Sequence, residues 1–153
     1  MTENTETHYL ETLYQELALA LGDAVWAFAR IEWLTFESIG KLTTDRLDEI
    51  VGDINFRSRT SILKKLVERK DSINSVKKKA LKLITEAEKL SEKRNIIVHN
   101  PWRIWVDLDA RDFMTEIQKY SNKDKKVNLK ELRDFIESAS KLENQLKEAL
   151  NAL

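Results

Sequence analysis

The chain of 153 residues contains no cysteine, one proline and only three glycines. Without cysteine there is no disulfide framework, no thiolate metal site and no cysteine nucleophile. Because glycine and proline interrupt regular secondary structure, their scarcity favours a helical protein with few tight turns. The two histidines, His8 and His99, are too few for a multi-histidine metal site within one chain, and we expect neither a metal nor a cofactor.

Long apolar segments are also missing. No run approaches the roughly 20 residues that a membrane helix needs, and the polar start MTENTETH does not resemble a signal peptide. We therefore expect a soluble, cytoplasmic protein that does not bind a membrane. The length predicts a single domain, residues 1–153, with a hydrophobic core.

The formal net charge is zero, but the charges are distributed unevenly. Residues 1–50 carry ten acidic and three basic side chains, whereas residues 57–82 carry ten basic and two acidic ones. A basic block of this kind suits a polyanion, and Arg57 and Arg59 at its start are candidate RNA contacts. The alternative is a solvated helix face whose charge the acidic N-terminal part offsets.

Apolar residues at helical spacing run through most of the chain. They predict a long first helix over about residues 7–41 that continues through Gly22, a short helix that Gly52 ends, and a third helix up to about Lys70. We also assign Trp26 and Trp33 to packing. The expected buried face of the first helix consists of Leu10, Leu13, Tyr14, Leu17, Leu21, Val25, Phe28, Phe36 and Ile39.

A fourth helix is expected to begin near Ser72 as its cap. Because Pro101 disfavours helical geometry at Asn100, this helix should end with His99 in its last turn. Its apolar stripe, which Arg94 interrupts, consists of Ile73, Val76, Ala80, Leu83, Ala87, Leu90 and Ile97.

The segment after Pro101 changes to a period of two. Apolar and polar residues alternate over residues 102–108, DFMTEIQKY can return as a second strand, and LDAR would be the turn between them. Asn128 with Glu131 forms a capping-box pattern at the start of the last helix. The sequence therefore predicts an all-α bundle of four to five helices with a small β-hairpin before the last helix.

Two charges, Glu32 and Arg94, occupy stripes that should be buried, where lone charges are rare unless paired. A pair between them would lock the first and fourth helices together, but it would not explain His99. Arg94 and His99 are about 140° apart on an ideal helix, so one helix does not easily aim both at one point. Either the long arginine stem reaches round, or a second chain supplies the missing member.

These two side chains suit phosphodiester cleavage. A histidine can take a proton from a hydroxyl or give one to a leaving oxygen, and an arginine can hold two phosphate oxygens. RNA brings its own nucleophile, the 2′-hydroxyl, so the reaction needs no metal and no protein nucleophile.

The stretch RNIIVHNPW, residues 94–102, resembles the R-x4-6-H motif of HEPN domains, in the form with an asparagine after the arginine. The order of helices is also similar to that family. The resemblance implies a helical domain whose homodimer joins two motifs into one site, with Arg94 on the phosphate and His99 as acid and base. Asn95 would orient His99 or bind substrate, and Glu32 would help to orient the site.

The activity that this resemblance implies is a metal-independent endoribonuclease in a toxin–antitoxin or phage-defence setting, with RNA as substrate and an antitoxin as a possible partner. One HEPN toxin subgroup has a modifiable tyrosine two residues after the histidine; here that position is Pro101. Two alternatives remain open. One is a non-catalytic helical module that binds a protein or nucleotide, and the other is an immunity or antitoxin protein with a structural Arg94–Glu32 pair.

Trp102 and Trp105 fall on opposite faces of the expected strand, so one should join the core and the other should be exposed. An exposed tryptophan here is either a dimer contact or a platform for a base, and Trp102 is the candidate RNA contact. We expect the dimer to form through the end of the fourth helix and this segment. The Lys77–Lys79 run lies about 30 Å from His99 along a straight helix, so it can hold only a distant stretch of RNA or an acidic partner.

Overall fold

The computed structural model of the chain describes residues 3–107 and 112–153. The turn predicted at LDAR lies outside the described residues. The elements in chain order are α1 (Glu3–Leu42), α2 (Leu47–Ile50), α3 (Phe56–Arg69), α4 (Asn74–His99), β1 (Trp102–Asp107), β2 (Asp112–Gln118), β3 (Lys126–Asn128) and α5 (Leu129–Asn151).

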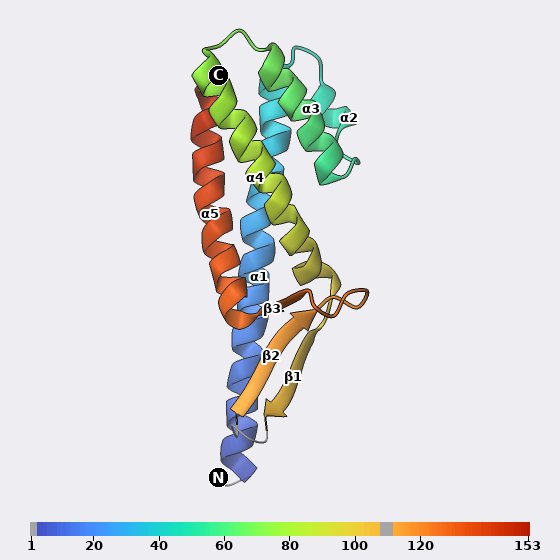
Figure 1. The fold of residues 1–153 in the computed structure, drawn as a ribbon, viewed down its shortest axis with the longest axis vertical. Coiled ribbons are helices and arrows are strands. Elements are labelled where there is room, and N and C mark those ends of the chain that lie inside the picture. Colours follow the sequence, from blue (N-terminus) through green and yellow to red (C-terminus); the bar gives the residue numbers. More distant parts are fainter. Residues whose placement is uncertain (1–2, 108–111) are drawn as a thin grey trace.

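The helices form an elongated bundle, as predicted (Figure 1). α1 and α5 lie side by side along the long axis, α4 crosses in front of them, and α3 packs beside the upper parts of α1 and α4. The small sheet lies beyond the lower end of α4, next to the N-terminal half of α1. No helix in the described part of the chain is long and apolar enough to cross a membrane.

The sheet has three antiparallel strands in the order β1-β2-β3 rather than the predicted hairpin of two. β1 and β2 occupy the predicted segments, and Trp102 pairs with Ile117 in their register. β3 was not predicted because it is only three residues long, with the single buried residue Val127 between two exposed ones. It places the chain next to β2 immediately before the α5 capping box, which Asn128 and Glu131 form as predicted.

The long first helix is confirmed and runs through Gly22 without interruption, but its predicted buried face is only partly correct. Leu10, Tyr14 and Val25, which were expected inside, are exposed. The inward face instead carries small residues, Ala20, Ala24 and Ala27, because α1 packs closely against α5 and α3. Counting large apolar residues overlooks such alanines.

The assignment of Trp26 and Trp33 to packing was wrong. They are 71% and 69% exposed, and together with Leu19 they recur at intervals of seven residues along the outer side of α1. Both side chains were assigned to the interior because they are large and apolar, the same criterion that gave a partly incorrect buried face for α1.

The start of α4 also differs from the prediction. Its N-cap residue is Ile73, which makes no side-chain cap hydrogen bond and is exposed, so Ser72 is not the cap. Its end at His99 is confirmed, and Ala80, Leu83 and Ala87 of the predicted stripe are buried. The C-terminal end of α4 therefore presents Arg94, Asn95 and His99 where the bundle meets the sheet.

Candidate functional site

Arg94 and Glu32 form an ion pair that joins α4 to α1, with the Arg94 Nη2 group donating to Glu32 Oε1. Arg94 also donates from Nη1 to Asn95 Oδ1 at 2.9 Å, and its guanidinium lies 5.1 Å from the centroid of the Phe28 ring. The contact predicted between the two charged positions is confirmed. The pair fixes the arginine from one side and leaves it partly accessible.

A second guanidinium, that of Arg59 on α3, lies beside the same carboxylate. Its Nη2 atom is 4.0 Å from Glu32 Oε1, and its planar group lies 3.7 Å from the centroid of the Phe36 ring. Burial lowers the pKa of Arg59, as does the nearby Arg94, while Glu32 raises it. Arg59 is buried, with 5% of its surface exposed, whereas Arg57 is exposed.

The side chains of Glu32, Arg59 and Arg94 line one opening, here called the Arg94 cleft. Its lining includes Glu32, Arg57, Arg59 and Arg94, together with Asn95. Three arginines line this cleft together with three carboxylates, Glu32, Glu88 and Glu92, so its positive and negative charges are equal in number.

Glu88 was not recognised from the sequence. Its carboxylate accepts hydrogen bonds from Lys64 Nζ at 2.6 Å and Thr60 Oγ1 at 2.7 Å, which tie α4 to α3. Burial alone would raise the pKa of Glu88, but these hydrogen bonds and the charges of Lys64 and Arg57 outweigh burial, so the pKa lies below its ordinary value.

His99 lies in a different opening, the His99 cleft, between the end of α4 and the loop that follows β2. Its side chain is exposed, and the cleft also includes Asn95, Asn100 and Tyr120. Five lysines line it against two acidic residues, Glu92 and Asp124; the lysines are Lys89, Lys93, Lys119, Lys125 and Lys126.

Asn100 holds this cleft together. Its Nδ2 donates to the Ile96 carbonyl oxygen at 2.9 Å, and its Oδ1 accepts from the Tyr120 backbone N–H at 3.2 Å. The asparagine thus attaches the end of α4 to the loop between β2 and β3, which brings Lys119 and Lys125 near His99. Sequence reasoning missed these lysines because they follow the histidine by 20 residues or more and reach it only through the fold.

In the part of one chain that the structure describes, Arg94 and His99 line different clefts. The Arg94 cleft and the His99 cleft share only two lining residues, Glu92 and Asn95. This arrangement agrees with the divergence of the two side chains on the helical wheel. Asn95 is the residue placed between the arginine and the histidine.

The tryptophans divide as expected between the two faces of β1. Trp102 is half-buried and packs against the core, and its indole Nε1 is buried without a hydrogen-bond partner within the described residues. Trp105 is 37% exposed. Of the two, Trp105 is therefore the more accessible to a base or to a second chain.

In residues 3–107 and 112–153, no group of three or more His, Cys, Asp or Glu side chains is placed so that it could hold a metal ion. Comparisons with protein-family models, with curated proteins and with solved structures find no match to this chain. The likeness to HEPN domains therefore depends on residues 94–99 and on the order of the helices.

Proposed function

We propose that this protein is a metal-independent endoribonuclease of HEPN type that acts as a homodimer, in a toxin or phage-defence role. The observation that carries the proposal is the exposed position of His99 in a lysine-lined cleft at the end of α4. A histidine buried in the core and bonded to carbonyl groups could not reach a substrate. Here the imidazole is accessible and surrounded by cations that attract phosphate.

In the proposed reaction, the His99 imidazole takes the proton of an RNA 2′-hydroxyl while that oxygen attacks the adjacent phosphorus. The bond from phosphorus to the 5′-oxygen breaks, and a protonated His99 of the partner subunit gives its proton to the leaving oxygen. Products are a 2′,3′-cyclic phosphate and a 5′-hydroxyl. Arg94, held by Glu32 and Asn95, balances the charge that develops on the phosphate oxygens.

Two subunits are needed because Arg94 and His99 of one chain line different clefts. A two-fold axis near the end of α4 would set the His99 of each chain beside the Arg94 of the other. The composite site then has one base, one acid and two phosphate-binding arginines.

The test is to incubate purified protein with RNA in EDTA and to identify the ends of the products. We expect cleavage in the wild type and cyclic phosphate ends, and we expect His99→Ala to abolish cleavage while the circular dichroism spectrum is unchanged. The matched control is His8→Ala, the other histidine, which is also exposed and should cleave normally. Full activity of His99→Ala would refute the assignment.

One observation favours a second candidate, a non-catalytic helical binding module. Arg94 already has a carboxylate partner within its own chain, as a structural ion pair would. In that case neither the wild type nor Arg94→Ala would cleave RNA, and the substitution would lower only the stability of the fold.

A further inference from the structure

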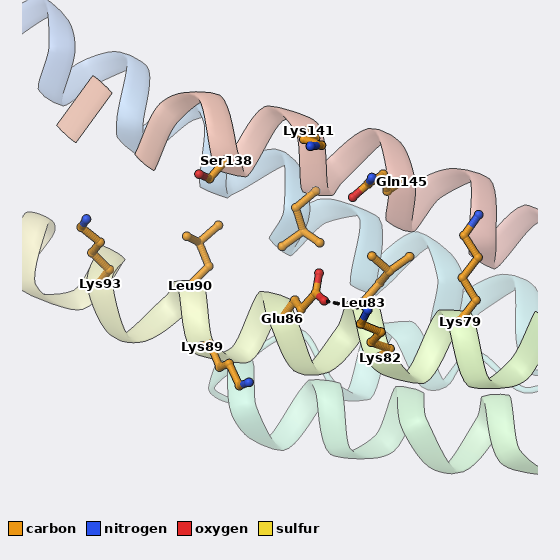
Figure 2. A pocket seen from close by; sticks show the side chains of 11 residues that line it. Lys79, Lys82, Leu83, Glu86, Lys89, Leu90, Lys93, Ser138, Lys141 and Gln145 are labelled. Atoms are coloured by element: carbon orange, nitrogen blue, oxygen red, sulfur yellow. Dashed lines mark ion pairs between the residues drawn. The ribbon is translucent and has the colours of Figure 1, made fainter. Parts of the chain in front are cut away.

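A third opening, here called the α4–α5 groove, lies on the side of α4 that faces α5 (Figure 2). Figure 2 shows Lys79 and Lys93 extending from α4 toward α5 at the two ends of the groove, with Leu83 and Leu90 between them. Lys141 lies opposite, on α5. The cavity volume is about 740 Å³, so the groove is large enough for an extended ligand.

The groove is strongly basic, although the formal net charge of the whole chain is zero. Five lysines line it against one acidic residue, Glu86, whose carboxylate is 3.9 Å from Lys82. The other four, Lys79, Lys89, Lys93 and Lys141, have no carboxylate partner in the part of the chain that the structure describes. Like charges left unpaired along one groove repel each other, and a bound polyanion would relieve that repulsion.

The groove and the His99 cleft are neighbouring openings, because Lys89 and Lys93 line both. Together the two openings hold eight different lysines and three acidic residues. Lys79 precedes His99 by 20 residues on the same helix, a distance of about 30 Å at the helical rise. The cations therefore form a track that leads along α4 to the histidine.

The form of the track favours a flexible chain with regularly repeated negative charge. Lysine ammonium groups are mobile point charges on long stems, which follow successive phosphates without requiring one fixed geometry. An apolar floor that includes Leu83 and Leu142 offers a surface to the bases or sugars. Because the track ends at His99, its occupant should be the molecule on which the histidine acts.

We propose that single-stranded RNA lies along the α4–α5 groove, with phosphates on Lys79, Lys93 and Lys141, and continues from there into the His99 cleft. The identity of the ligand rests on the proposed ribonuclease function, whereas the binding itself can be measured separately. The α4–α5 groove then determines the length of RNA that each subunit binds, and His99 determines the position at which the RNA is cleaved.

The experiment measures binding of a short fluorescent single-stranded RNA by anisotropy over a series of salt concentrations. The protein carries His99→Ala in every arm, so cleavage does not interfere. In this background, Lys79→Gln with Lys141→Gln should weaken binding at low salt by 10-fold or more. The slope of log affinity against log salt should fall by about 1.4, since each lost contact to a single strand contributes roughly 0.7.

The matched control is Lys65→Gln with Lys78→Gln, which also removes two exposed lysines. Lys78 adjoins Lys79 on the same helix but does not line the groove. We expect this control to keep the affinity and the slope of the parent protein, and both double variants should keep its melting temperature, because all four side chains are exposed.

The proposal is overturned if the two double variants lose affinity equally, if the salt slope of the groove variant is unchanged, or if polyglutamate of matched charge competes as well as unlabelled RNA. The ribonuclease proposal fails separately. RNA bound in the groove by a protein that never cleaves it would support the groove and refute the enzyme. If cleavage and binding are both unchanged by the substitutions of Lys79 and Lys141, the ribonuclease proposal is supported and the groove proposal is refuted.

Discussion

At the scale of single residues, the site depends on Glu32. This carboxylate lies between the guanidinium groups of Arg94 and Arg59, and it is the acidic residue that both of them approach within 4.0 Å. Without it, two cations from α3 and α4 would adjoin each other beside α1, each partly removed from water. Removing one member of such a group leaves unbalanced charge, which costs more than the intact pair contributes.

Glu32→Gln should therefore lower the free energy of unfolding by about 1–3 kcal/mol, less than for a fully buried pair because both side chains are partly accessible. Urea unfolding followed by circular dichroism measures the change. Glu37→Gln is a suitable control, because Glu37 on the same helix forms a surface ion pair with Lys41, 2.9 Å away. If Glu32→Gln proved as stable as this control, the pair would not hold α4 to α1.

Glu88 gives a pH-dependent prediction. Its pKa in the folded chain is below the ordinary value, so the unfolded chain binds a proton at Glu88 at higher pH than the folded chain does. The stabilisation from Glu88 is therefore complete above the ordinary glutamate pKa of about 4.3 and is lost as pH falls through the lower folded value.

Glu88→Gln should accordingly lower the free energy of unfolding at neutral pH by about 1–2 kcal/mol and flatten its decline below about pH 4.3. Urea titrations at a series of pH values would measure both effects. Glu92→Gln, an exposed position one turn further along α4, should retain the parent pH profile. Parallel profiles for Glu88→Gln and the parent would contradict the argument.

At the scale of elements, some features follow from the sequence and others do not. The end of α4 could be predicted because Pro101 disfavours helical geometry at the residue before it. The Glu32–Arg94 contact could be predicted because charged residues on apolar stripes need partners. The inward face of α1 could not be predicted from the sequence, because alanines become core residues only when a neighbouring helix approaches closely. The lysines near His99 depend on the Asn100–Tyr120 contact, which links positions 20 residues apart.

The exposed tryptophans of α1 lead to a stability prediction. Because Trp26 and Trp33 are mostly exposed, replacing either by alanine should change the free energy of unfolding by about 0.5 kcal/mol or less. Phe28→Ala, on the buried face of the same helix, should cost about 3–5 kcal/mol. Thermal or urea unfolding of dilute protein compares them, and a large loss from Trp26→Ala would show that the side chain is buried in solution.

At the scale of the whole molecule, the mechanism needs a second copy at a particular place. The end of α4 and the sheet expose a group of apolar side chains, and α1 exposes another. The first group consists of Val98, Ile104, Trp105, Val106 and Met114, and the second of Leu19, Trp26 and Trp33. An interface through the first group, which includes Val98 beside His99, would bring two His99 clefts near each other.

We therefore predict a homodimer through the end of α4 and β1. Each His99 cleft carries five lysines against two acidic residues, so two such clefts that face each other should associate more tightly when phosphate lies between them. Sedimentation at micromolar protein, with and without phosphate, would show this shift. Trp105→Lys should give monomers, and Trp33→Lys, an equally drastic change on the other apolar surface, should not. If the protein were monomeric in every condition, or if only Trp33→Lys separated the chains, Arg94 and His99 would have no common site and the proposed cleavage mechanism would be wrong.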